Sequence, residues 1–241
     1  MAAPSALFLA ALSLASAFRP YPLFKQCAEA WGSDEMGVAG AGERSTVCGE
    51  GCAMSCLAQV LSSCGVRLPG GAGPTALAAN PQSLNSWLLA HKGYTCIDGD
   101  CNNLVLDAVQ RLNSSIELVG ELPPLADIHA GLDNGTIAWI AHIPALTHFV
   151  LLTGYDDAQP NALAVNDPFY NATSYLYENI SDILVYRIPP PPPRERARGR
   201  LDAWLHSSRP SGAQSLGVHS APPPTESRRW AQPPTLTLKA Y

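Results

Sequence analysis

Residues 46–65, TVCGEGCAMSCLAQVLSSCG, decide how the rest of this 241-residue chain is organised. A turn with two glycines, residues 49–51, leads into an apolar run that begins at Cys52. Gly65 stands where a C-terminal helix cap would stand. The apolar positions recur at spacings of three and four, which is one face of a helix, and they are Met54, Leu57, Ala58 and Leu61. The stretch therefore predicts a helix over residues 52–64 that begins at Cys52.

A cysteine at the start of a helix is a candidate nucleophile. The helix dipole and the unpaired N–H groups of the first turn favour the thiolate there, and the thiolate is the reactive form. The alternative is that Cys52 is one more disulfide or core cysteine among the seven cysteines of the chain.

Composition limits the class of protein. With 241 residues and 46% hydrophobic content, the chain can form one ordinary domain with extensions, or two small domains. The net charge of −5 is uneven: residues 194–241 carry eight Arg or Lys against three Asp or Glu, which leaves about −10 on the residues before them. An acidic body argues against nucleic acid as the main partner.

The first 17 residues are typical of a secretory signal. Residues 7–14 form an apolar core, and Ala-Ser-Ala at 15–17 is a small-x-small cleavage site. An uncleaved membrane anchor is the alternative, but the apolar run is too short to span a bilayer. We expect no stable membrane span elsewhere, because His142, Pro144 and His148 interrupt the apolar stretch 136–154.

Asparagine sequons support secretion. Several N-x-Ser/Thr sites behind a signal peptide favour a glycosylated domain that is secreted, extracellular or luminal, in the secretory pathway and possibly in the lysosome or vacuole. The four candidate acceptors are Asn113, Asn134, Asn171 and Asn179.

Seven cysteines in an oxidising compartment leave one unpaired. We expect three disulfides and a free Cys52, with Cys96 and Cys101 as the easiest pair because only four residues separate them. The pairing among the other four stays open, and they are Cys27, Cys48, Cys56 and Cys64. No C-x-x-C spacing and no H-x(3–5)-H motif is present, so we expect no zinc site and no cofactor.

The chain outside the central stretch changes from helices to strands. Helical spacing and stop signals predict helices over 81–92, 104–112 and 124–132. Strands enriched in β-branched and aromatic residues are predicted at 136–143, 147–154, 163–166 and 183–188. Helices followed by an antiparallel sheet indicate an α+β fold. Five prolines at 189–193 predict a stiff spacer, and we expect residues 189–241, rich in Pro, Ser and Arg, to be disordered.

A cysteine nucleophile needs a base, and His148 is the best placed of the six histidines. If the strands around the polar turn 155–161 pair with Gly154 opposite Asn161, His148 falls opposite Asp167. Residues directly opposite share a face, so the carboxylate could orient the imidazole. The alternative is an ordinary sheet histidine and a turn aspartate. Gln26, upstream in an irregular segment, could donate to an oxyanion together with the Cys52 N–H.

These residues occur in an order that resembles cysteine peptidase family 39, the papain-like bacteriocin-processing peptidases and their stand-alone relatives. The elements are Gln26, Trp31-Gly32, Gly51-Cys52, Leu84-Asn85-x-Trp87-Leu88, His148-Phe-Val-Leu-Leu-Thr-Gly154-Tyr155-Asp156 and Asn166-Asp167-Pro168. The resemblance covers residues 21–188. It implies a papain-like fold in which N-terminal helices pack on a C-terminal antiparallel sheet. It also implies that Cys52 is the nucleophile, His148 the base, Asp167 its orienter and Gln26 the oxyanion donor.

The expected function is therefore a monomeric, secreted cysteine hydrolase whose substrate is a peptide or protein. Two alternatives stay open. An amidase or acyl transferase could use the same fold and the same residues. A catalytically inactive, disulfide-stabilised binding module would instead have Cys52 in a bridge.

Overall fold

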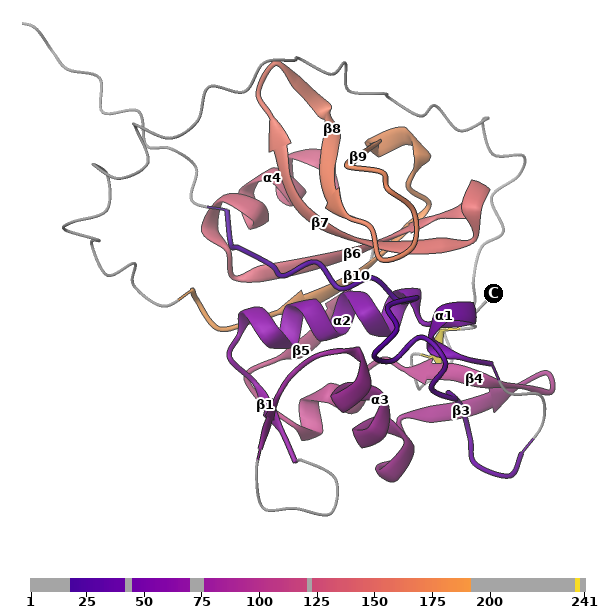
Figure 1. The fold of residues 1–241 in the computed structure, drawn as a ribbon. Coiled ribbons are helices and arrows are strands. Elements are labelled where there is room, and N and C mark those ends of the chain that lie inside the picture. The colour runs from indigo at the N-terminus through magenta and orange to yellow at the C-terminus, as the bar shows by residue number, and fades with distance from the viewer. Residues whose placement is uncertain (1–17, 42–44, 70–75, 121–122, 192–236, 239–241) are drawn as a thin grey trace, which may run out of the picture.

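The structure, a computed structural model, describes residues 18–41, 45–69, 76–120, 123–191 and 237–238. The predicted signal peptide (1–17) and most of the predicted tail (189–241) lie outside the described residues. Helices and short strands alternate as far as α4, and most of a large antiparallel sheet follows, so the fold is α+β, as the sequence predicts (Figure 1).

A six-stranded antiparallel sheet dominates the second half of the chain. Its strand order is β5-β10-β6-β7-β8-β9. The strands are β5 (Glu117–Gly120), β6 (Ile137–Ile143), β7 (His148–Asp156), β8 (Gln159–Asn166), β9 (Ser174–Leu176) and β10 (Asp182–Arg187). The strands predicted at 136–143, 147–154, 163–166 and 183–188 correspond to β6, β7, β8 and β10.

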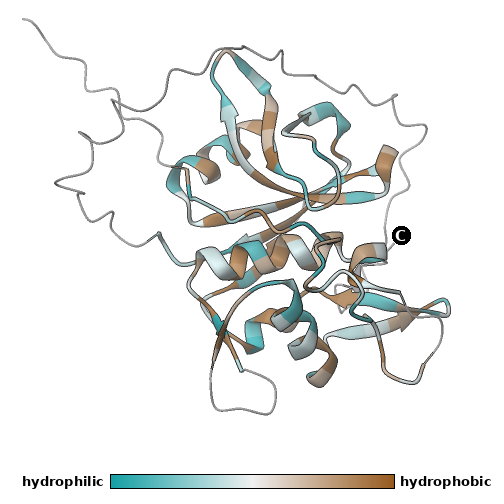
Figure 2. Ribbon diagram, viewed as in Figure 1, coloured by the Kyte–Doolittle hydropathy of each residue, from teal (hydrophilic) through white to brown (hydrophobic). Residues whose placement is uncertain are grey.

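Both faces of this sheet are buried, because apolar residues occupy both sides of the pleat. Alternate residues of β6 and β7, such as Ile140 and Leu151, join a core with the helices at the N-terminal end of the chain. Their neighbours, such as Ala141 and Val150, join a second core with α4 (Leu125–Asn134). Figure 2 shows the middle strands mostly in hydrophobic colours, with hydrophilic residues at the outer end of the β7–β8 hairpin.

The helix α2 (Cys52–Ser63) lies in the middle of the molecule (Figure 1). It packs between the large sheet and α3 (Pro81–Ala90), and eight of its twelve residues are buried. The short helix α1 (Val47–Glu50) precedes it directly. Two small sheets lie on the α3 side: β1 (Arg67–Leu68) with β2 (Leu77–Ala78), and β3 (Tyr94–Ile97) with β4 (Asp100–Val105).

The sequence-based assignment fails in several places. It contains no strand for β1–β5 or β9, and β7 and β8 extend into the predicted turn 155–161, of which only residues 157–158 form the turn. The helix predicted at 104–112 is wrong: β4 extends to Val105, and only residues Ala108–Arg111 form a short 3-10 helix. Strand pairing with β3 overrides the local helical spacing here. In the tail, Thr237–Leu238 form β11, which pairs antiparallel with β4, so this dipeptide departs from the predicted disorder.

In the part of the chain that the structure describes, no helix is both long and apolar enough to cross a membrane.

Candidate active site

Cys52 is the first residue of α2, and the turn before it is held tightly. Thr46 caps α1, because its hydroxyl accepts a hydrogen bond of 3.1 Å from the Gly49 N–H. Gly51 then joins the two helices, and its N–H donates to the Val47 carbonyl at 2.9 Å. A Cβ at Gly51 would lie 2.4 Å from that carbonyl oxygen, so only glycine fits. Cys52 is partly exposed and forms no disulfide.

His148 and Asp167 form a buried pair. Nε2 of His148 lies 2.8 Å from Oδ1 of Asp167, and the two residues are only 5% and 2% exposed. The backbone N–H groups of Phe169 and Tyr170 also donate to Oδ1, each at 2.8 Å. The carboxylate is therefore fixed from two sides, by the ring and by its own loop.

The two residues meet in a different register from the predicted one. Asp156 does lie opposite Gln159, as the prediction requires, but irregularities in the β7–β8 ladder then place Gly154 opposite Ala164 and Leu151 opposite Asn166. Near His148 the ladder is thus displaced by two residues, and the predicted pairing of Gly154 with Asn161 is wrong. Side chains on a strand alternate with period two, so a shift of two residues keeps Asp167 on the same face, within reach as a diagonal neighbour.

The electrostatics of the pair favour a charged imidazole. Burial by itself would lower the pKa of His148, but hydrogen bonds with Asp167 and Cys52, and the charges of both groups, raise this pKa to about 9. Burial would raise the pKa of Asp167, yet the hydrogen bond and the charge of His148, with the other donors, hold it below its usual value. Because Nε2 of His148 is bonded to Asp167, Nδ1 is the ring nitrogen that remains for Cys52.

Gln26 connects the two halves of the site. It is 3% exposed, its side-chain Nε2 donates to the Cys48 carbonyl at 2.7 Å, and its backbone N–H donates to the Pro168 carbonyl at 2.8 Å. A carbonyl acceptor requires the amide nitrogen on that side, so the orientation of the amide is determined. One N–H of Nε2 is left over, while Oε1 is buried and has no hydrogen-bond partner among the described residues.

Neighbouring residues brace the loop after Asp167. The Lys25 ammonium donates to the backbone carbonyls of Asp167 (2.9 Å) and Tyr170. Phe169 and Tyr170 stand edge-on to the His148 ring, with ring centroids 6.3 and 5.3 Å away. Both aromatic rings are exposed, at 47% and 40%, so they form an apolar margin beside the histidine.

The disulfides differ from the expected three. Two are present, Cys27–Cys48 and Cys96–Cys101, and the second is the local pair that the spacing predicted. Cys56 and Cys64 are both free, so the expectation of a third disulfide is wrong. They lie eight residues apart along the α2 axis, roughly 12 Å, which is beyond the span of a disulfide. Burial raises the pKa of both thiols.

Three of the four sequons are accessible. Asn134 and Asn171 are exposed and Asn113 is half-buried. Nδ2 of Asn179, the atom that would carry a glycan, is buried without a hydrogen-bond partner among the described residues. The folded protein therefore offers Asn179 no room for a glycan.

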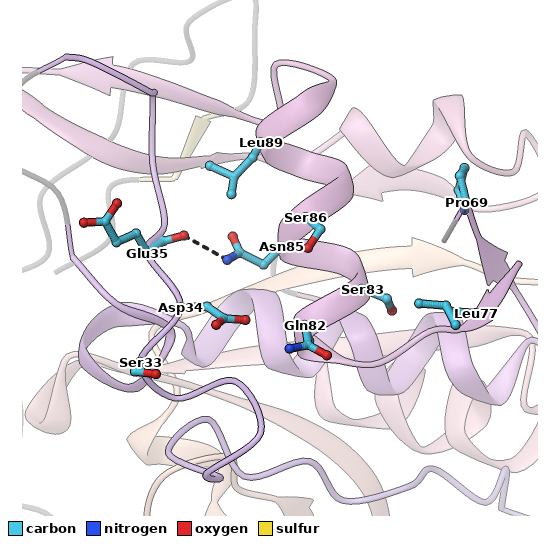
Figure 3. Close-up of a pocket in the computed structure, with 10 residues that line it drawn as sticks. All are labelled: Ser33, Asp34, Glu35, Pro69, Leu77, Gln82, Ser83, Asn85, Ser86 and Leu89. Atoms are coloured by element: carbon cyan, nitrogen blue, oxygen red, sulfur yellow. Dashed lines mark hydrogen bonds between the residues drawn. The ribbon is translucent and has the colours of Figure 1, made fainter. Parts of the chain in front are cut away.

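A hollow of about 560 Å³ lies on the α3 side of the molecule and contains none of the candidate catalytic side chains (Figure 3). It lies between α3 and the segment 33–35, with Asp34 and Gln82 facing each other across it (Figure 3). A backbone hydrogen bond of 2.9 Å, from the Val47 N–H to the Asp34 carbonyl, links the rim of the hollow to α1. Within the described ranges, no group of three His, Cys, Asp or Glu residues could hold a metal ion.

Tyr175 also belongs to the site, although the sequence does not point to it. Its hydroxyl donates to Oδ2 of Asp167 at 2.8 Å, and the residue is 5% exposed. No sequence signal marks it, because its place depends on the pairing of β9 with β8, in which Tyr175 lies opposite Leu163.

No protein-family model, no curated protein and no solved structure matches this chain.

Proposed function

We propose that the chain is a secreted cysteine hydrolase with a papain-like arrangement, related to cysteine peptidase family 39, that cleaves amide bonds in peptides or proteins. The observation that carries the proposal is the buried His148–Asp167 pair, with Cys52 close enough to the imidazole to contribute to its raised pKa. A cysteine at a helix start, an imidazole and a buried carboxylate are the groups that nucleophilic acyl transfer requires.

In the proposed mechanism, His148 takes the Cys52 proton on Nδ1, and the resulting imidazolium is stabilised by Asp167. The thiolate attacks the carbonyl carbon of an amide. The oxyanion accepts hydrogen bonds from the Cys52 N–H and from the second N–H of Gln26 Nε2. His148 then returns its proton to the leaving amine, and water releases the acyl group from sulfur. Asp167 stays ionised throughout, because its pKa is held below the usual value.

Two observations support the proposal over a disulfide-locked binding module. Cys52 is not bridged, and it is partly exposed while the other two groups are buried. The two disulfides fit an oxidising compartment, such as the secretory pathway or the lysosome or vacuole, and so does the predicted signal at residues 1–17.

Differential alkylation tests the nucleophile. The full chain is treated with iodoacetamide without reductant at pH 6–8, and the labelled cysteines are mapped by mass spectrometry. Cys64 is the internal comparison, because it is also unbridged and partly exposed. We expect Cys52 to react at least about tenfold faster than Cys64, and Cys56 to stay unlabelled because it is fully buried. A rate at Cys52 no higher than that at Cys64 would contradict the proposal.

Cleavage tests the reaction. A fluorogenic peptide library is incubated with wild type, Cys52→Ser and the control Cys64→Ser. We expect cleavage to disappear in the first variant and to remain in the second. Undiminished cleavage by Cys52→Ser would reject the assigned nucleophile. Added amines distinguish a hydrolase from an acyl transferase, since only a transferase passes the acyl group on to them.

A further inference from the structure

The Asp167 carboxylate receives its hydrogen bonds unevenly. Oδ1 accepts three, from His148 and from the N–H groups of Phe169 and Tyr170. Oδ2 accepts from the Tyr175 hydroxyl. If that hydroxyl were absent, the oxygen would stay enclosed at a residue that is only 2% exposed, where water could not easily replace the donor.

Tyr175 is held rigidly enough to act as a support. It lies in β9 opposite Leu163 of β8, and the residues on either side of it also pair with β8. Its ring belongs to the core that α4 shares with the sheet. Burial, followed by the adjacent carboxylate, raises the pKa of Tyr175 well above its usual value, so the phenol keeps its proton at neutral pH. A phenol beside a carboxylate can then only donate.

We propose that Tyr175 is a positioning residue of the candidate active site: its hydroxyl fixes the Asp167 carboxylate, which in turn orients the His148 ring toward Cys52. The inference rests on the proposed function, in which the same three groups form the catalytic unit. Tyr175 itself is separated from the sulfur by two residues, Asp167 and His148, and has no direct part in the bond changes. The hydroxyl acts by keeping the carboxylate ionised and at a fixed angle.

The test compares two buried tyrosines. Tyr175→Phe removes the donor to Asp167, and Tyr186→Phe is the matched control, because Tyr186 is fully buried and its hydroxyl donates at 2.9 Å to the Leu106 carbonyl. The pH dependence of Cys52 alkylation is measured for the full chain from pH 3 to 8. It needs no substrate, so its result does not depend on knowing which peptide is cleaved.

We expect Tyr175→Phe to move the acid limb of the alkylation profile toward higher pH by roughly half a unit to one unit. The sign follows from the carboxylate: without its donor, Asp167 is protonated at a higher pH, and the His148 ring loses its orienting partner sooner as the pH falls. Tyr186→Phe should leave the limb in place. In an Asp167→Asn background, Tyr175→Phe should shift the limb by less than about 0.2 unit, because the group through which it acts is gone.

A profile of Tyr175→Phe that superimposes on that of wild type would overturn the inference and leave the proposed function intact. A wild-type Cys52 that reacts no faster than Cys64 would overturn both. A measurement on the unmutated residue covers the case in which Tyr175→Phe does not fold: with a ¹³C label at tyrosine Cζ, one resonance should titrate with the acid limb, and this titration should be absent in Asp167→Asn. If no tyrosine resonance follows the limb, the inference is wrong.

Discussion

The His148 imidazolium is the group on which the upper pH limit of the proposed reaction depends. Its pKa is raised to about 9 against the opposing effect of burial, by the hydrogen bonds and charges of Asp167 and Cys52. The imidazolium is therefore the dominant form below about pH 9, and it is lost as the pH rises through that value. Since this proton is needed to protonate the leaving amine, hydrolysis should decline on the alkaline side near pH 9.

Asp167→Asn tests this dependence. Replacing the carboxylate weakens its hydrogen bond to the imidazolium, which is the leading cause that raises the His148 pKa, and removes its charge as well. The alkaline limb of kcat/KM should therefore move to lower pH by about one unit or more. At the optimum, kcat/KM should fall by roughly 10²-fold. The readout is cleavage of the best peptide from the library between pH 5 and 10.

Asp182→Asn is the control for Asp167→Asn. Asp182 is exposed, and its charge acts on His142, whose pKa is lowered by burial and raised in part by this carboxylate. The variant removes the same charge near the site without removing a hydrogen bond to His148. If the two variants shifted the alkaline limb equally, the buried pair would have no special role.

At the scale of single elements, the junction between α1 and α2 determines where Cys52 lies. A methyl group at Gly51 would lie 2.4 Å from the Val47 carbonyl oxygen, which is backbone and cannot rotate away. At Gly49, two residues earlier, the nearest atom to an added methyl group is Ser45 Oγ at 2.5 Å, and that side chain can move. The same substitution therefore has different consequences at the two glycines of one turn.

We expect Gly51→Ala to lower the free energy of unfolding by about 1–3 kcal/mol and to slow Cys52 alkylation at least about tenfold. Gly49→Ala should change stability by less than about 0.5 kcal/mol and leave the alkylation rate near that of wild type. Chemical denaturation and the iodoacetamide assay measure both effects. Equal alkylation rates in the two variants would show that the turn does not position the sulfur.

The disulfide Cys27–Cys48 joins the segment that carries Gln26 to α1. Its sequence separation is 21 residues, whereas that of Cys96–Cys101 is 5. Replacing both cysteines of the first bridge by serine should cost about 3 kcal/mol, and replacing those of the second about 2 kcal/mol. Only the first replacement should also lower kcat, because Gln26 Nε2 donates to the carbonyl of Cys48 itself. A loss of kcat in the Cys96/Cys101 variant as well would contradict this assignment.

At the scale of the whole molecule, the candidate site forms where the two cores meet. The α2 helix and the facing side of β6 and β7 form the first core, and the opposite side of these strands forms the second with α4, β8 and β9. Cys52 begins the helix of the first core, while Tyr175, which donates to Asp167, belongs to the second core. The sheet thus carries the candidate base, His148, and the helix α2 carries the candidate nucleophile, Cys52.

This division explains how much the sequence could predict. Local patterns were sufficient for α2, for the strands β6, β7, β8 and β10, and for the pair Cys96–Cys101, because each depends on neighbours in the chain. The sequence predicts the contact between His148 and Asp167 from a wrong register. The contact is nevertheless present, because a shift of two residues leaves both side chains on the same face of the sheet. Tyr175 and the free state of Cys56 and Cys64 depend on strand order and helix packing, and local patterns do not contain these.

An N-terminal strap, residues 18–26, holds the halves together (Figure 1). At one end, the buried Arg19 donates to the carbonyls of Ser63 (3.0 Å) at the C-terminus of α2, Gly135 (3.2 Å) after α4, and Pro189 after β10. At the other end, Gln26 lies beside Cys48. One guanidinium therefore satisfies carbonyls from three parts of the chain, and it also lies at the negative end of the α2 dipole.

We expect Arg19→Ala to lower the free energy of unfolding by about 2–4 kcal/mol, because three carbonyls lose a charged donor where water cannot easily replace it. Arg187→Ala is the matched control: Arg187 pairs with Glu117, but its side chain is 58% exposed, and exposed ion pairs contribute less than about 1 kcal/mol. Urea denaturation of both variants, with limited proteolysis at Lys25 as a local probe, measures the difference. Arg19→Ala should expose the strap to cleavage while Arg187→Ala does not. Equal stability losses and equal cleavage would show that the strap is held by its apolar residues, Phe18 and Tyr21, and not by the guanidinium.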